Sequence, residues 1–159
     1  MKQENVKKEI GKCSIVDLKD RPSVIAYLGF LQDVISRMGG NSSNIKALIA
    51  VVYTIFVTIL IAIKELNGYW WGGLIIAIVG MIMDTYYLAL ERMYRKKYNV
   101  FVDKLNNGQI DVKEIYKMNP KSTDLKYEVF AVILEAITSF SVTGFYILFI
   151  GITILLKFI

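Results

Sequence analysis

Residues 74–105 read LIIAIVGMIMDTYYLALERMYRKKYNVFVDKL, and this stretch decides the fold because it passes from a membrane-like sequence into a water-like one without a helix breaker. Its first part is almost purely apolar. Its second part keeps an apolar stripe at helical spacing, made of Met83, Tyr87, Leu90, Tyr94, Phe101 and Leu105. Asn106, Asn107 and Gly108 then predict the end of the helix. We therefore expect one helix that crosses a bilayer and continues into an aqueous layer.

The composition is typical of a membrane protein with polar flanks. Hydrophobic residues make up 55% of the 159 residues, and the mean hydropathy is +0.45. Charged residues still make up 21%, but they gather in a few segments. One cysteine, Cys13, and the lack of histidine exclude an intramolecular disulfide, His-based catalysis and His-ligated zinc. The sequence also has no phosphate-binding glycine loop or nucleophile elbow, so we expect neither an enzyme nor a cofactor.

Three apolar runs predict three membrane spans. The first covers residues 45–63, and the second extends from Gly72 to Leu90. The third lies within 129–156 and is most apolar from Ile137 to Leu156. The expected fold is an all-α membrane protein with three transmembrane helices, an N-terminal amphipathic helix and a cytoplasmic extension of the second span.

The amphipathic helix is expected at residues 22–38. Its apolar face repeats at helical spacing and consists of Val24, Leu28, Leu31, Ile35 and Met38. This face either packs on other helices of the same subunit, which we favour, or lies on lipid. The segment Gly39-Gly40-Asn41-Ser42-Ser43 predicts a break that ends this helix and caps the next one.

These elements divide the chain into four segments. Residues 1–44 are expected to form a cytoplasmic tail and the amphipathic helix. Residues 45–105 form a helical hairpin with two transmembrane spans and the cytoplasmic extension. Residues 106–128 are a cytoplasmic connection, with a short helix expected at 109–118, and residues 129–159 hold the third transmembrane helix.

The lysine and arginine residues predict the orientation of the chain. All 19 of them, except Lys64 and Lys157, precede the first span, stand at its N-terminal edge (Lys46) or lie between residues 92 and 126. Positive residues concentrate on the cytoplasmic side of membrane proteins. We therefore expect the N-terminus and the long connection in the cytoplasm and the C-terminus outside.

Asp84 lies inside the second span, where a carboxylate is costly and tends to face the interior of a helix bundle. Gly73, Ala77, Gly80 and Asp84 share one helix face, and their small size lets another helix approach closely. Lys46 has a compatible depth in the first span, so we expect it to pair with Asp84. This pair is either a structural ion pair or part of a gate, and both alternatives stay open.

Two further sets of residues are candidate functional sites. Hydroxyls in membrane helices often bond to their own backbone, but three polar residues of the third span are candidates for lining a wet vestibule in an oligomer: Glu135, Thr138 and Ser141. The second set is a basic cluster with tyrosines suited to base stacking: Arg37, Arg92, Arg95, Lys96, Lys97, Tyr94 and Tyr98. It is expected to contact anionic lipid or, in an oligomer, a nucleotide or short oligonucleotide.

Two passages resemble a group of small bacterial membrane proteins with three spans. They are residues 31–42, LQDVISRMGGNS, and residues 84–95, DTYYLALERMYR; Gly39-Gly40 is richer in glycine than the group's pattern. Some of these proteins resemble membrane effectors of anti-phage defence, such as the Hailong type, where an effector channel is paired with a nucleotidyltransferase. The resemblance implies a homo-oligomeric channel of the bacterial inner membrane that depolarises the infected cell and is held in check by a nucleotide-type ligand.

Two functions from different classes fit the sequence. The first is a toxic ion channel, which requires several subunits because three spans are too few for a roomy pore in a monomer. The second is a non-conducting membrane adaptor that recruits a soluble cytoplasmic partner. A weaker third alternative is a small transporter subunit, which would be supported by discontinuous spans and internal repeats that the sequence does not show.

Overall fold

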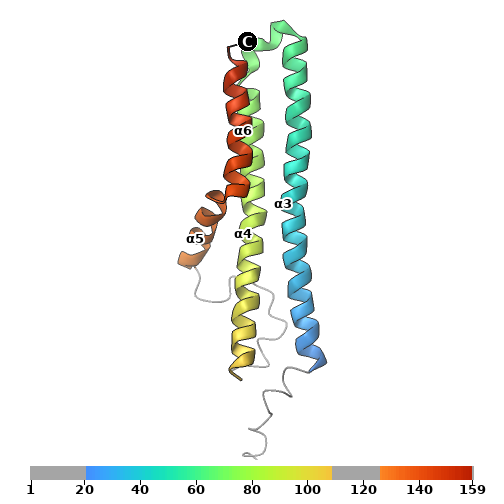
Figure 1. Cartoon of the computed structure of the whole chain (residues 1–159), viewed down its shortest axis with the longest axis vertical. Coiled ribbons are helices and arrows are strands. Elements are labelled where there is room, and N and C mark those ends of the chain that lie inside the picture. The colour runs from blue at the N-terminus through green and yellow to red at the C-terminus, as the bar shows by residue number, and fades with distance from the viewer. Residues whose placement is uncertain (1–20, 109–125, 159) are drawn as a thin grey trace, which may run out of the picture.

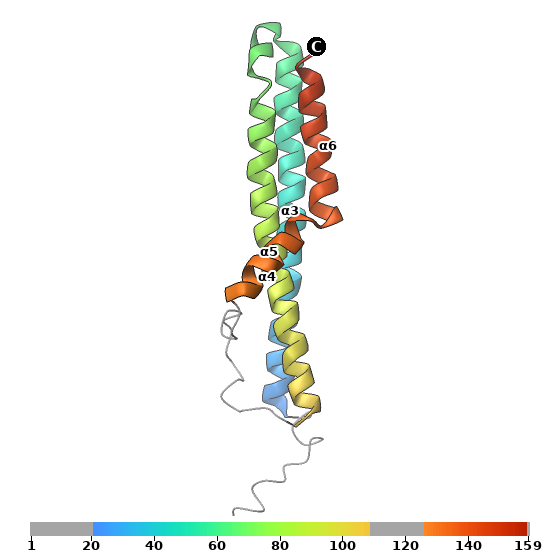
Figure 2. The same ribbon diagram turned by 90° about the vertical axis from the view of Figure 1, so that its left-hand side faces the viewer.

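The structure is a computed structural model, and it describes residues 21–108 and 126–158. Five helical elements account for its regular structure: α3 (Pro22–Ala62), the 3-10 helix η1 (Lys64–Tyr69), α4 (Gly72–Asn106), α5 (Lys126–Ile137) and α6 (Phe140–Leu156). Figures 1 and 2 show a long antiparallel hairpin of α3 and α4, with α6 along the half of the hairpin nearest its turn. Cys13 and the short helix expected at 109–118 lie outside the described residues. The expected all-helical class is confirmed for the described part.

Two helices, α3 and α4, are long and apolar enough to cross a membrane. The predicted first and second spans are thus confirmed as candidate spans. Helices α5 and α6 qualify as a third only if the two are taken as one bent span, because they meet at an angle of 51°. The 17 residues of α6 alone rise roughly 25 Å, which is close to the thickness of a hydrocarbon core.

Helix α4 has the extent that residues 74–105 predict. It continues without interruption for 35 residues, ends at Asn106 and is capped by Asn107. Gly108 follows with a φ of 68°, a conformation that glycine adopts without a steric penalty. At roughly 52 Å, this helix is longer than a bilayer core is thick, so part of it must extend beyond one.

The break predicted at Gly39–Ser43 is wrong, because α3 continues through this segment for 41 residues. A glycine inside a helix costs about 1 kcal/mol relative to alanine, and packing against α4 offsets that cost here. A Cβ added at Gly39 would lie 3.1 Å from the carboxylate of Glu91, so the two helices approach closely at this point. Ser42 donates its hydroxyl hydrogen to Asp84 instead of capping a helix. Contacts between helices therefore override the local breaker signals.

The ends of the hairpin farthest from its turn form a packed unit, which we call the two-helix arm (residues 22–38 and 92–106). Its buried core contains Val24, Tyr27, Leu31, Phe101 and Leu105, with Leu28, Tyr94 and Tyr98 packed against it. The rings of Tyr27 and Phe101 meet edge to face with 4.9 Å between their centroids. This confirms that the amphipathic face of residues 22–38 packs within the subunit rather than on lipid.

Two details of the predicted apolar stripes are wrong. Met83, the first member of the stripe on α4, has 47% of its surface exposed. On α3 the buried face also includes Tyr27 and Val34, whereas Ile35 is only half-buried. The buried face of α3 differs from the predicted one because α4 packs on the side that holds Tyr27 and Val34. The periodicity of a single helix does not show on which side its neighbour packs.

Helix α6 completes a three-helix core beside the turn of the hairpin. The buried side chains of this core are Ile49, Tyr53, Ala77, Val142, Tyr146 and Phe149. The hydroxyl of Tyr53 donates to the carbonyl of Phe149 at 2.9 Å and lies 2.7 Å from the hydroxyl of Thr153. At the end of α6, the ammonium of Lys157 lies 5.5 Å from the ring centroid of Trp70. These contacts place the C-terminal end of α6 beside the turn between α3 and α4 (Figure 1).

Two glycines of the hairpin are expected to respond oppositely to alanine. A Cβ at Gly80 would lie 2.6 Å from Cγ1 of Ile49, so Gly80→Ala should destabilise the fold by about 1–3 kcal/mol. At Gly40 nothing lies within 4 Å, so Gly40→Ala should stabilise it by about 0.5–1 kcal/mol through helix propensity. Melting temperatures of the two variants in the same detergent check this. A melting temperature of Gly80→Ala equal to or above that of the wild type would contradict the close approach at Gly80.

Candidate functional site

A buried polar cluster joins α3 and α4 in the region of the expected membrane. Asp84 has 0% of its surface exposed. The ammonium of Lys46 lies 2.7 Å from its Oδ2 and 2.9 Å from its Oδ1. The Ser42 hydroxyl donates to Oδ1, and Lys46 donates to the Ser42 oxygen at 3.1 Å. Both oxygens of a costly buried carboxylate are thus compensated by a cation or a donor.

The sequence positions these groups through helical spacing. Ser42 and Lys46 are four residues apart, so both lie on the face of α3 toward α4. On α4, Ala77 and Gly80 are buried on the same face as Asp84 and leave room for α3 to approach. The predicted pairing of Lys46 with Asp84 is confirmed, whereas Ser42, predicted to cap a helix, instead bonds to Asp84 in the same cluster. Since Asp84 is enclosed within one protomer, the geometry favours a structural ion pair over a group that touches a conduction path.

Two more hydroxyls are buried near this cluster. Those of Thr85 and Tyr146 have no hydrogen-bond partner among the described residues. Buried hydroxyls beside a charged group are typically satisfied by ordered water.

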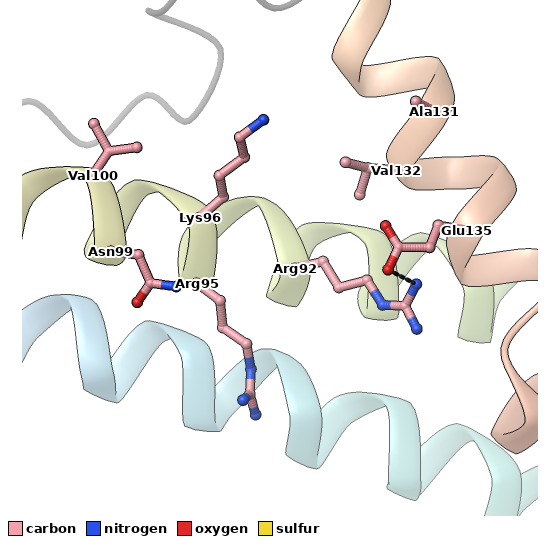
Figure 3. A pocket seen from close by; sticks show the side chains of 8 residues that line it. All are labelled: Arg92, Arg95, Lys96, Asn99, Val100, Ala131, Val132 and Glu135. Carbon is pink, nitrogen blue, oxygen red and sulfur yellow. Dashed lines mark ion pairs between the residues drawn. The ribbon is translucent and has the colours of Figure 1, made fainter.

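A second polar region surrounds a cavity of about 460 Å³ between α4 and α5 (Figure 3). It is lined by Arg92, Arg95, Lys96, Asn99 and Val100 of α4 and by Ala131, Val132 and Glu135 of α5. The guanidinium of Arg92 lies 3.0 Å from the carboxylate of Glu135, and this ion pair joins the two helices. Arg95 pairs instead with Glu91 of its own helix at 2.7 Å, and Figure 3 shows its side chain pointing away from α5.

The structure divides the predicted basic cluster. Of its cations, Arg92, Arg95 and Lys96 line the cavity, whereas Arg37 and Lys97 do not. Tyr94 and Tyr98, which were expected to stack on a ligand, pack instead against the buried core of the two-helix arm. The Tyr98 hydroxyl also accepts a hydrogen bond from Gln32 at 3.1 Å. Their aromatic surface is used for folding, because the helical stripe that contains Phe101 also contains them.

The three predicted vestibule residues lie around the bend between α5 and α6. Glu135 has 70% of its side chain exposed and pairs with Arg92. Thr138 donates to the carbonyl of Leu134 at 3.0 Å, and Ser141 is exposed in the first turn of α6. The bend leaves carbonyls at the end of α5 without intrahelical partners, and the hydroxyl of Thr143 donates to the carbonyl of Ile137 at 2.6 Å. The hydroxyls of Thr138 and Thr143 thus satisfy backbone carbonyls in this segment.

Sequence reasoning missed two exposed hydroxyls on the membrane-length part of α3. Thr54 and Thr58 are both exposed, and each donates to the carbonyl four residues earlier, Ala50 or Thr54, at 2.8 Å. Such bonds make a threonine tolerable in an apolar environment. The available signal was the pair of threonines four residues apart in an otherwise apolar run, which places both on one helix face.

Comparisons of the chain with known protein families, with curated proteins and with solved structures found no match. Among the described residues, no group of three or more Cys, Asp or Glu side chains is arranged to hold a metal ion. The function is therefore inferred from three local features. These are the buried cluster at Asp84, the cavity beside Arg92 and the exposed hydroxyls of α3.

Proposed function

We propose that the chain is one protomer of a homo-oligomeric ion channel in the bacterial inner membrane, where it acts as a toxic effector in anti-phage defence. In this proposal α3, α4 and α6 are three spans, and α5 lies at the cytoplasmic surface of the membrane. The lysine and arginine distribution supports a cytoplasmic N-terminus and an outer C-terminus. The two-helix arm then extends into the cytoplasm.

The observation that carries the proposal is the exposed pair Thr54 and Thr58 outside a filled protomer core. The interior between the three spans is occupied by large side chains, including Tyr53, Tyr146 and Phe149. A conduction path therefore has to lie between protomers rather than within one. A threonine hydroxyl that donates to its own backbone keeps an acceptor site, which water or a cation in such a path can use.

The proposal is tested by cysteine accessibility in a Cys13→Ser background. Thr58→Cys should react with a charged, water-soluble thiol reagent and lose current in a planar bilayer, because a wet path exposes the thiol. The matched control is Ile82→Cys, which is also exposed on a span but belongs to α4. Its thiol, facing lipid, should not react. Absence of current from the unmodified protein, or equal reactivity at both positions, would overturn the proposal.

A second candidate function is a non-conducting adaptor. The two-helix arm favours it, because the arm is packed by its own core and still presents an exposed polar surface that includes Gln32, Asp33 and Arg37. Expression in bacteria separates the two candidates. A channel depolarises the cells without any partner, which a potential-sensitive dye reports, whereas an adaptor alone leaves the membrane potential unchanged.

A further inference from the structure

We infer that the cavity between α4 and α5 binds the phosphate group of an anionic phospholipid, and that Glu135 takes the place of this phosphate on Arg92 when no lipid is bound. The site goes beyond the proposed function, because it requires no conduction and would be present equally in an adaptor. Three observations carry the inference: the spacing of the cations, the exposed carboxylate of Glu135 that pairs with Arg92, and the apolar surface beside the cavity.

Helical spacing places the cations next to one another along α4. Arg95 and Lys96 follow Arg92 by three and four residues, and Asn99 follows Lys96 by three. These side chains therefore emerge from neighbouring positions on α4. The lining thus offers Arg92, Lys96 and the amide of Asn99 beside a single carboxylate, Glu135, whereas Arg95 pairs with Glu91 and points away from α5. A guanidinium binds a phosphate through two parallel hydrogen bonds, which fits Arg92 to this ligand better than a lysine would fit.

The ion pair between Arg92 and Glu135 is suited to exchange. The Glu135 side chain is 70% exposed and lies 3.0 Å from Arg92, so water can solvate this carboxylate when it leaves the guanidinium. A phosphate diester carries a full negative charge and can accept from Arg92 while it is also attracted to Lys96. When the phosphate binds, Glu135 leaves Arg92, and one polar contact between α5 and α4 is lost.

The surroundings favour a lipid as the source of the phosphate. The cavity follows directly on the apolar part of α4, where Ile82 and Tyr86 are exposed. On the other side, Leu134 and Ile137 of α5 are exposed, and Phe140 at the start of α6 has 92% of its surface exposed. Apolar side chains next to a cationic cavity match a molecule with acyl chains and an anionic head group.

The inference is tested by native mass spectrometry of the full chain released from detergent. Phosphatidylglycerol and phosphatidylcholine are added in equal amounts, and the retained copies of each are counted. The wild type should retain phosphatidylglycerol preferentially. Arg92→Gln should reduce this retention about tenfold, since it removes a charge-assisted contact, and Glu135→Gln should raise it about threefold, since it removes the competing carboxylate.

The matched control is Asp103→Asn, which makes the same change in net charge at an exposed site on α4 that is not part of the cavity lining. It should leave retention within about twofold of the wild type. Equal retention by the wild type and Arg92→Gln, or equal gains for Glu135→Gln and Asp103→Asn, would overturn the site. A separate arm titrates inorganic pyrophosphate without lipid. Binding there with the same dependence on Arg92 and Glu135, and none of phosphatidylglycerol, would keep the phosphate site and overturn its lipid source.

Discussion

Replacing Asp84 with leucine is expected to destabilise the fold by about 3–5 kcal/mol, because it leaves the ammonium of Lys46 between two helices without its partner. The side chain of Lys46 is mostly buried, so water cannot replace the carboxylate fully. Asp84→Asn keeps the shape and the bond from Ser42, so it should retain the fold, and if the chain forms the proposed channel it should change the activity or toxicity of that channel. Thermal melting in detergent measures the first effect, and bacterial growth on expression measures the second.

The double variant Lys46→Met, Asp84→Leu distinguishes loss of the ion pair from loss of shape. It replaces both charges by apolar groups, so much of the stability lost in Asp84→Leu alone should return. A double variant as unstable as the sum of the two single variants would show that Lys46 and Asp84 are not coupled. Wild-type toxicity of both Asp84→Asn and Asp84→Ala would remove Asp84 from the functional residues.

Phe101→Asp is expected to destabilise the two-helix arm by about 4 kcal/mol, because it removes an aromatic ring from a buried core and introduces a charge. The ring of Phe101 meets Tyr27 edge to face, so the loss affects both helices of the arm. Protection of arm amides from hydrogen exchange should fall, while the core beside α6 should stay protected.

The neighbouring Val100 supplies the control for this prediction. It is exposed on α4, so Val100→Asp introduces the same charge next to Phe101 without opening the core of the arm. The expected loss is within about 1 kcal/mol. Equal exchange in the arm for Phe101→Asp and Val100→Asp would contradict the packing of Phe101 in that core.

Features set by periodicity or by the cost of a buried charge could be predicted from the sequence. The stripe at Phe101 and Leu105 has to be covered, and the amphipathic helix at residues 22–38 supplies a matching face. Asp84 likewise requires a cation at its own depth, and Lys46 is the one at the edge of the first span. In both predictions a buried group requires a specific kind of partner, an apolar face in one case and a cation in the other. The requirement identifies the partner in the sequence.

Features set by packing between helices could not be predicted in this way. Gly39 and Gly40 look like a break, but the approach of Glu91 and the bond from Ser42 to Asp84 keep α3 helical. The bend between Ile137 and Phe140 contains neither proline nor glycine, so no helix-breaking residue in the sequence predicts it. The bend places Glu135 beside Arg92. The position of the bend therefore depends on contacts with α4 and not on the residues at the bend itself. The same holds for Tyr94 and Tyr98, whose surroundings are decided by α3.

The unbroken course of α3 and α4 has a mechanical consequence. A helix without a joint transmits rotation and tilt along its whole length, and here two such helices are fastened to each other by Phe101 at one end and by the Lys46–Asp84 pair farther along. A force applied at the tip of the two-helix arm therefore tilts the α3–α4 hairpin as one body, up to the turn at Trp70, instead of bending the helices between these points. The junction between α5 and α6 is different, because the helix is interrupted there and bends by 51°, and the ion pair between Arg92 and Glu135 links α5 to α4.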